Sequence, residues 1–167
     1  FEETVEAQWH ARARLLAQRI TQLERQLGAC AQQSPACEQL FSVPGIGLIT
    51  ATAIVAATGG QVTHFRSARH FSSWFGITPK EHSSGSSRHL GRISKRGNRY
   101  LRTMIMQGAR VILLRPANWA KHSFGPWLTA AANRLHHNVL ATALANKLAR
   151  IAWTVLMQAR SYEARVN

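Results

Sequence analysis

Apolar side chains recur every seven residues between positions 3 and 30. They hold the a and d positions of a heptad repeat: Ala13, Ile20 and Leu27 at a, and Trp9, Leu16, Leu23 and Cys30 at d. This pattern predicts one long helix whose apolar stripe must be covered, either by the chain's own domain or by a second chain in a coiled coil. The run Gln-Gln-Ser-Pro at 32–35 ends the helix and divides a helical segment, 1–38, from a compact domain, 39–167.

The compact domain is predicted to consist of short helices joined by tight turns. Ser67 and Asn98 are favourable N-caps for helices that end near Phe75 and before Pro116. A last helix is expected over about 137–161. Its apolar face carries Leu140, Leu144, Leu148, Ile151 and Val155. No segment shows the alternation of a strand, so the predicted fold class is mainly α.

The charge of the chain is strongly one-sided. Its formal net charge is +14, from 21 Lys and Arg against 7 acidic residues, and Asp is absent. Between positions 39 and 162 the single carboxylate is Glu81. Clustered carboxylates for catalytic metal ions or for a glycosidase pair cannot be built from one Glu, so self-contained enzymes of those classes are excluded. Cys30 and Cys37 match no zinc or redox spacing, so no metal site is predicted here, and the charge favours a polyanionic partner.

A glycine-containing turn is the first candidate binding element. The sequence Ser-Val-Pro-Gly-Ile-Gly-Leu predicts a tight turn between helices that end near Phe41 and start near Leu48. The backbone amides of Gly45 and Gly47, with the positive end of the second helix, would hold a phosphate without reading a base. The pattern resembles a helix-hairpin-helix DNA-binding element over about 39–58. The alternative is an ordinary glycine-rich turn between helices.

A basic segment rich in Ser and Gly follows. Over 79–97 it predicts an exposed loop with room for a short hairpin. Seven basic side chains between positions 80 and 102 are candidates for phosphate contacts: Lys80, Arg88, Arg92, Lys95, Arg96, Arg99 and Arg102. Such a stretch is typical of salt-dependent binding to nucleic acid.

Two adjacent serines in this loop, Ser83 and Ser84, are candidate nucleophiles. A Ser hydroxyl can attack a phosphodiester while guanidinium groups stabilise the developing charge. His82 and His89 flank the serines and are candidate general bases or phosphate donors. A flexible Ser-Gly linker with solvated histidines is the alternative.

Several motifs in one order resemble a known family. They are Val43-Pro-Gly-Ile-Gly, Phe65-Arg-Ser-Ala-Arg, Phe75-Gly-Ile-Thr-Pro, Ser84-Gly, Ile93-Ser-Lys-Arg-Gly-Asn and the helix Ala145–Trp153. Over roughly 39–158 the chain is similar to the C-terminal domain of insertion-sequence transposases that act as bridge-RNA-guided recombinases.

The resemblance implies a role for the serines. Ser84, which precedes Gly85, would be the nucleophile that becomes covalently joined to DNA, with Ser83 as the second candidate. The complete enzyme would also have an N-terminal RuvC-like domain with four acidic residues, which is absent here and would bind Mg²⁺. No cofactor is therefore expected in this chain itself. Residues 1–38 would belong to the coiled coil between the two domains and would form a dimer or a tetramer.

The implied partners are donor and target DNA and a guide RNA, in the cytoplasm of a bacterium or archaeon, at the nucleoid. No membrane is expected, because Pro44 and several glycines break the charge-free stretch 39–65. Two other classes stay open. One is a module that binds nucleic acid and oligomerises without chemistry. The other is a helix-hairpin-helix scaffold of DNA repair, which explains the turn but neither the Ser-Gly nor the Lys-Arg-Gly-Asn motif.

Overall fold

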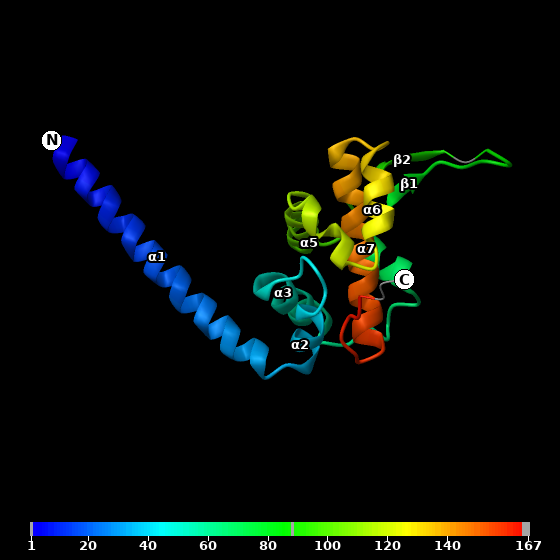
Figure 1. The fold of residues 1–167 in the computed structure, drawn as a ribbon. Helices are drawn as coiled ribbons and strands as arrows, with labels where there is room; N and C mark the ends of the chain where they lie inside the picture. The colour runs from blue at the N-terminus through cyan, green and yellow to red at the C-terminus, as the bar shows by residue number, and fades with distance from the viewer. Residues whose placement is uncertain (1, 88, 165–167) are drawn as a thin grey trace.

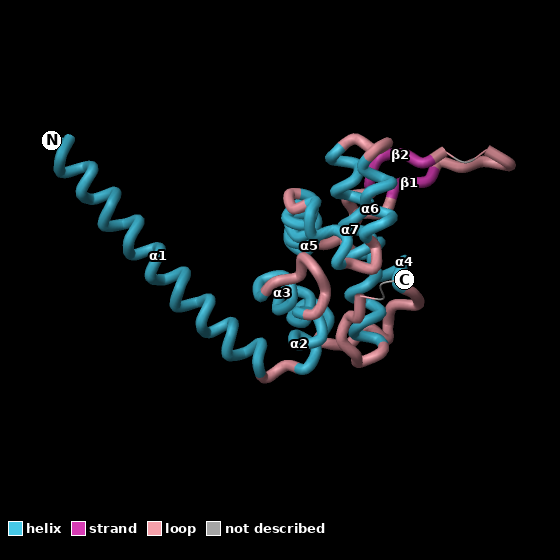
Figure 2. Tube along the Cα trace, in the orientation of Figure 1, coloured by secondary structure: helices cyan, strands magenta, loops and turns pink. Residues whose placement is uncertain are grey.

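A long helix leaves a body of shorter helices on one side, and a two-stranded arm leaves it on the other (Figure 1). This computed structural model describes residues 2–87 and 89–164. The elements, in chain order, are α1 (Glu2–Gln32), α2 (Pro35–Phe41), α3 (Leu48–Thr58), α4 (Ala68–Trp74), β1 (Pro79–Glu81), β2 (Leu90–Ile93), α5 (Arg99–Leu113), the 3₁₀-helix η1 (Pro116–Lys121), α6 (Gly125–Ala132) and α7 (His137–Met157). Within the described residues the strands belong to the arm (Figure 2). The prediction of a mainly α fold is confirmed.

The heptad helix, α1, extends away from the body (Figure 1). Its described side chains are exposed from Val5 to Leu27, and the Trp9 side chain is 67% exposed. At the foot of the helix Ala31 is buried where α1 meets α2 and α3. The alternative in which the apolar stripe packs on the chain's own domain is therefore wrong. The alternative in which it pairs with a second chain remains a prediction.

The hydrophobic core forms around α7, which packs against α4 and α5. Leu144 and Leu148 of α7 are fully buried. The rings of Phe71 in α4 and of Phe75, which follows α4, enter the same core and meet edge to face, with 5.0 Å between their centroids. Full burial of each such side chain stabilises the fold by about 1.5–3 kcal/mol.

The last helix starts at the predicted position but ends at Met157 rather than near 161. Ala159 adopts the left-handed conformation, with φ 48°, and the N–H of Arg160 donates to the Val155 carbonyl at 3.2 Å. The N–H of Ala159 also donates to the Leu156 carbonyl, at 3.4 Å. The two bonds form the Schellman motif that normally uses glycine. Because no glycine marks this end in the sequence, the predicted end was too late.

The length and composition of α7 would also suffice to cross a membrane, with a mean hydropathy of 1.3. Half of that apolar stretch is buried inside the fold. Within the described part of the chain, α7 therefore has the properties of a core helix.

Side-chain caps start two of the helices as predicted. The Ser67 hydroxyl accepts from the backbone N–H of His70 at 3.2 Å, and the side-chain Oδ1 of Asn98 accepts from the backbone N–H of Leu101 at 3.1 Å. Each bond satisfies an N–H group that the first helical turn leaves without a partner.

Replacing Asn98 with alanine is expected to lower the free energy of unfolding by about 1 kcal/mol, because the cap of α5 is lost. The measurement is urea unfolding of the chain followed by circular dichroism. Asn98→Asp, which keeps a capping oxygen, should stay close to the parent. Equal losses for both variants would contradict the capping role.

Two glycine contacts fix how α5 and the arm join the body. Gly45, with φ 78°, lies against Gly108 of α5, and a Cβ on Gly45 would come within 2.8 Å of the Gly108 carbonyl oxygen. Gly97, with φ 125°, lies against the Trp74 carbonyl at the end of α4. Both contacts bring backbone onto backbone, which no side chain would permit.

The hairpin arm comprises residues 79–93 and is antiparallel. Pro79 pairs with Ile93 and Glu81 with Leu90, with an irregularity between the two pairs. The ladder continues outward, because the His82 N–H donates to the His89 carbonyl at 2.9 Å. The predicted exposed loop is thus an antiparallel hairpin, and Arg88 lies outside the described residues.

Candidate nucleic-acid interface and nucleophile

Ser84 lies at the tip of the hairpin arm. The backbone N–H of Ser84 donates to the Ser87 carbonyl at 3.2 Å, and the N–H of Ser87 donates back to the Ser84 carbonyl at 3.1 Å. Gly85, with φ 58°, takes the first place of the two-residue turn, where a type II′ hairpin turn requires glycine. The Ser84 side chain is exposed and makes no hydrogen bond within the described residues.

The neighbouring hydroxyl groups have partners. The Ser83 hydroxyl donates to a carboxylate oxygen of Glu81 at 2.8 Å. Ser87 Oγ lies 3.0 Å from His89 Nε2, in a hydrogen bond whose direction depends on the imidazole tautomer. Because a Ser hydroxyl bonded to an imidazole is a pair suited to nucleophilic attack, Ser87 is a candidate that sequence reasoning missed. The signal was a Ser-x-His spacing, which places both side chains on one face of a strand.

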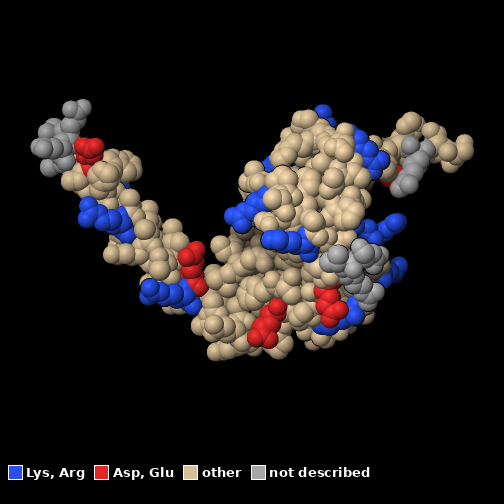
Figure 3. Space-filling model, viewed as in Figure 1, with Lys and Arg blue, Asp and Glu red and all other residues tan. Residues whose placement is uncertain are grey.

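Most of the predicted phosphate-binding side chains are exposed on the arm and beyond its base. Lys80 lies on β1 and Arg92 on β2. Lys95 and Arg96 follow the arm, and Arg99 begins α5. Their exposure leaves their charges available to a polyanion. On the face shown in Figure 3, Lys and Arg side chains are spread over the body more widely than carboxylates, while both kinds alternate along α1.

Arg102 has a structural role that the sequence did not predict, and its phosphate contact remains a prediction. Its guanidinium Nη1 donates to the carbonyl oxygens of Phe75 and Lys95, at 3.2 and 3.3 Å. The N–H of Lys95 donates to the Gly76 carbonyl at 3.0 Å. The Lys-Arg-Gly-Asn motif therefore closes the base of the arm on the end of α4. An Arg side chain has five N–H donors, so some remain for a phosphate.

The two candidate glycines of the turn differ in their surroundings. Gly47 is exposed and starts α3, and no side chain caps the first turn of that helix. Its position fits an open helix N-terminus with free N–H groups. Gly45 is half-buried and is explained by its contact with Gly108. The helices end at Phe41 and start at Leu48 as predicted, and phosphate binding at this turn remains a prediction.

Metal-binding side chains do not gather within the described residues. No three His, Cys, Asp or Glu side chains there lie close enough together to hold a metal ion. The expectation of Mg²⁺ bound by acidic residues outside this chain remains a prediction.

Residues 37–124 match the model of the transposase IS116/IS110/IS902 family. The chain belongs to this family. The matched part runs from α2 to the residues after η1 and includes the glycine turn, the hairpin arm and α5. The predicted resemblance to insertion-sequence transposases is confirmed.

The chain is also similar to named relatives, two of which are transposases. Over 147 residues the chain is 43% identical to a probable family 20 transposase of Pseudomonas aeruginosa. This alignment covers 88% of the present chain and 43% of the relative. It is 38% identical over 144 residues to the transposase for insertion sequence element IS1111A of Coxiella burnetii, with 86% of this chain and 39% of the relative covered. A pilin gene-inverting protein of Moraxella bovis is 28% identical over 160 residues, and the alignment covers 89% of the present chain and 46% of that protein. The chain thus spans less than half the length of these relatives.

Proposed function

We propose that this chain is the part of a transposase that binds nucleic acid and supplies the Ser84 hydroxyl for DNA strand cleavage and exchange. The observation that supports it most is the place of Ser84 in the fold. Ser84 lies exposed at the tip of an arm that carries cationic side chains, and its hydroxyl has no partner among the described residues. A nucleophile presented in this way can reach a phosphodiester held on another surface.

The proposed reaction is a transesterification. The Ser84 Oγ attacks the phosphorus of a DNA phosphodiester and forms an ester bond, while the bond from phosphorus to one deoxyribose oxygen breaks and that oxygen takes up a proton. The Oγ proton passes to a base, for which His82 and His89 are the candidates on the arm. Because no water is consumed, the serine ester can be attacked by a deoxyribose hydroxyl of a second strand, which rejoins the DNA.

The proposed nucleic-acid surface comprises the exposed cations of the arm and its base, together with the first turn of α3. These groups contact phosphates without reading bases, so choice of sequence would come from a guide RNA that pairs with DNA. Both donor and target DNA are then partners.

The test is to map the covalent adduct. The complete transposase, with its guide RNA, is incubated with DNA carrying its site, and the DNA-linked peptide is identified by mass spectrometry after proteolysis. We expect the link on Ser84, and no adduct from the present chain alone, because metal-dependent steps would need acidic residues outside it. A link on Ser83 or Ser87 would overturn the Ser84 assignment. Binding of DNA with no adduct from the complete protein would favour the non-catalytic module.

Cations of the arm should control the salt dependence of DNA binding. In the double variant Lys80→Gln/Arg92→Gln, the slope of log K against log salt should fall by about 2, because each lost phosphate contact removes close to one released counterion. The measurement is fluorescence anisotropy with labelled duplex DNA at several salt concentrations. Arg14→Gln/Arg134→Gln, which removes two exposed charges elsewhere, is the matched control. Equal slopes in both variants would contradict the proposed surface.

The stripe on α1 is proposed to pair with α1 of a second chain. Its exposed a and d positions include Leu16 and Leu23, which are 60% and 44% exposed. Leu16→Glu/Leu23→Glu should convert a dimer into a monomer in sedimentation equilibrium, because charges in the seam oppose pairing. Leu15→Glu, at the c position just outside the seam, should leave the dimer intact. A wild-type chain that stays monomeric at all concentrations would rule out the coiled coil.

A further inference from the structure

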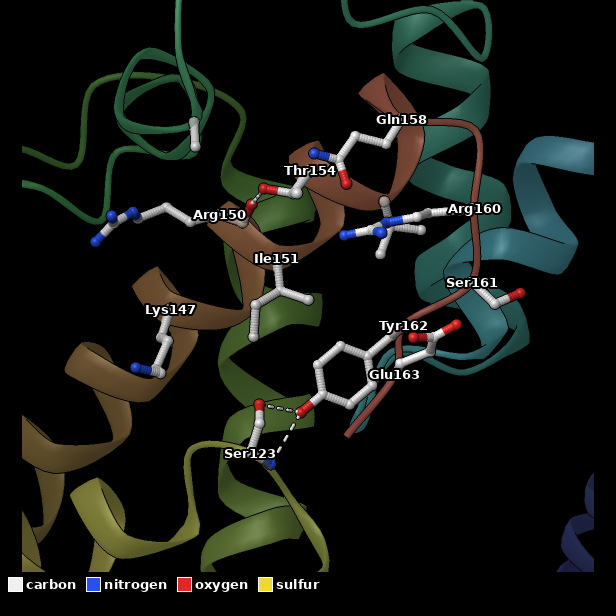
Figure 4. Close-up of a pocket in the computed structure, with 12 residues that line it drawn as sticks. Ser123, Lys147, Arg150, Ile151, Thr154, Gln158, Arg160, Ser161, Tyr162 and Glu163 are labelled. Atoms are coloured by element: carbon white, nitrogen blue, oxygen red, sulfur yellow. Dashed lines mark hydrogen bonds between the residues drawn. The ribbon is translucent and has the colours of Figure 1, made fainter. Parts of the chain in front are cut away.

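A pocket of about 360 Å³ lies between the C-terminal half of α7 and the tail that follows it. Lys147 and Arg150 of α7 and Arg160 of the tail all line it (Figure 4). In the figure, Arg160 extends from the tail toward α7, across the pocket from Thr154 and Ile151. These cations come from two segments and are separate from the arm and from the turn before α3.

Within the described residues, hydrogen bonds of the Tyr162 side chain and backbone hold the tail in place. The N–H of Tyr162 donates to the Ser42 hydroxyl at 2.7 Å. The Tyr162 hydroxyl is hydrogen-bonded to Ser123 Oγ at 2.6 Å and accepts from the Ser123 N–H at 3.1 Å (Figure 4). These bonds, with the Schellman turn at Ala159, set the path that brings Arg160 to the pocket.

The charges of the pocket are not balanced within the described chain. Lys147, Arg150 and Arg160 make no ion pair with a described carboxylate, and Glu163 is the one carboxylate that lines the pocket. Partial burial lowers the pKa of Lys147, and the neighbouring charge of Arg150 lowers that pKa further. The Lys147 ammonium also lies over the Trp127 ring, 4.9 Å from its centroid. An anion in the pocket would relieve the repulsion between Lys147 and Arg150.

We propose that this pocket binds a phosphate group of a nucleic-acid backbone, as a contact additional to the arm. The proposal rests on the proposed function, because it takes nucleic acid as the ligand. Arg160 extends from the tail toward α7, and Arg150 extends from α7 on the side away from Arg160 (Figure 4). Each guanidinium group offers its own paired N–H donors to phosphate oxygens, and Lys147 adds a point charge. Thr154 and Ser161 add hydroxyl groups to the lining. The pocket opens at the surface, so a phosphate within a long polymer can reach it without a free end passing through the protein.

The test compares two charge-matched variants of the chain. Arg150→Gln/Arg160→Gln removes two exposed cations of the pocket, and Arg14→Gln/Arg134→Gln removes two exposed cations elsewhere. Binding of duplex DNA and of single-stranded RNA is measured by fluorescence anisotropy over a range of salt concentrations, and thermal unfolding confirms that both variants fold. We expect the pocket variant to bind at least one of the two nucleic acids about tenfold more weakly than the control, with a salt slope smaller by at least about 1. The polymer affected identifies the source of the phosphate.

Other outcomes would overturn the proposal. If the wild-type chain binds nucleic acid and the two variants bind equally, the pocket is not a phosphate contact while the proposed function stands. If inorganic phosphate alone raises the melting temperature of the wild type but not of the pocket variant, and nucleic-acid binding is unchanged, the assignment to nucleic acid is wrong. If the wild-type chain binds neither polymer at low salt, this proposal and the nucleic-acid part of the proposed function both fail.

Discussion

Ser84→Ala in the complete transposase is expected to abolish the protein–DNA adduct and to reduce strand joining by at least about 10³-fold. The alanine removes the oxygen that would form the ester bond and leaves the turn intact, because the hydrogen bonds to Ser87 use the backbone of Ser84. Adduct formation is measured by gel shift after denaturation, and joining by quantitative amplification of the new junction.

Two neighbouring serines supply the controls for this prediction. Ser83→Ala removes a hydroxyl that is bonded to Glu81, and Ser87→Ala removes one that is bonded to His89. Both variants should retain the adduct, and all three should bind DNA like the wild type. If the Ser84→Ala variant joined strands at the wild-type rate, the assignment of Ser84 as the nucleophile would be wrong. Loss of the adduct in Ser87→Ala alone would transfer the role to the Ser87–His89 pair.

Gly108→Ala is expected to lower the free energy of unfolding of the chain by about 3 kcal/mol and the melting temperature by about 6–12 °C. A Cβ at Gly108 would overlap the carbonyl oxygen of Gly45, which is backbone and cannot rotate away. Relief requires α5 to move off the glycine turn, and this movement opens the core where Ile105 and Ile112 are buried. Thermal unfolding followed by circular dichroism at 222 nm measures the change.

Gly28→Ala is the matched control for this overlap. Gly28 lies in α1, and nothing comes within 4 Å of a Cβ built there. Alanine in a helix interior is more favourable than glycine by about 0.5–1 kcal/mol, so this variant should melt at or above the parent temperature. A Gly108→Ala protein as stable as Gly28→Ala would show that α5 and the turn are not in tight contact.

Local signals in the sequence predicted most of the helices. Ser67 and Asn98 carry an oxygen three residues before the N–H group that each one caps, and such a cap needs no distant contact. The end of α7 was missed because Ala159 takes a conformation usually given to glycine. The heptad pattern predicted α1, but the direction in which α1 leaves the body depends on the break at Ser34. Because α1 points away from the body, the body does not cover its apolar stripe.

The candidate site was predictable in its residue types and less so in its geometry. The Ser-Gly and basic residues of the arm were recognised from composition and from a family resemblance. The structural roles of Gly45 and Arg102 were not, because they depend on contacts with α5 and α4 that lie far along the chain. The α7 pocket was equally hidden, since it needs the path of the tail that Tyr162 holds.

The shape of the arm has a mechanical consequence. From Pro79 at the base of the arm to Ser84 at its tip, the extended chain spans about 17 Å, at about 3.4 Å per residue. A tilt of about 10° at the base would therefore displace the Ser84 hydroxyl by about 3 Å, whereas a reacting group must be held within about 0.5 Å. The contact of Gly97 with the Trp74 carbonyl fixes the base of the arm but does not hold its tip. A second contact at the tip, from a partner surface or from the bound nucleic acid, would then be needed to position Ser84. This requirement would restrict strand cleavage to the fully assembled complex.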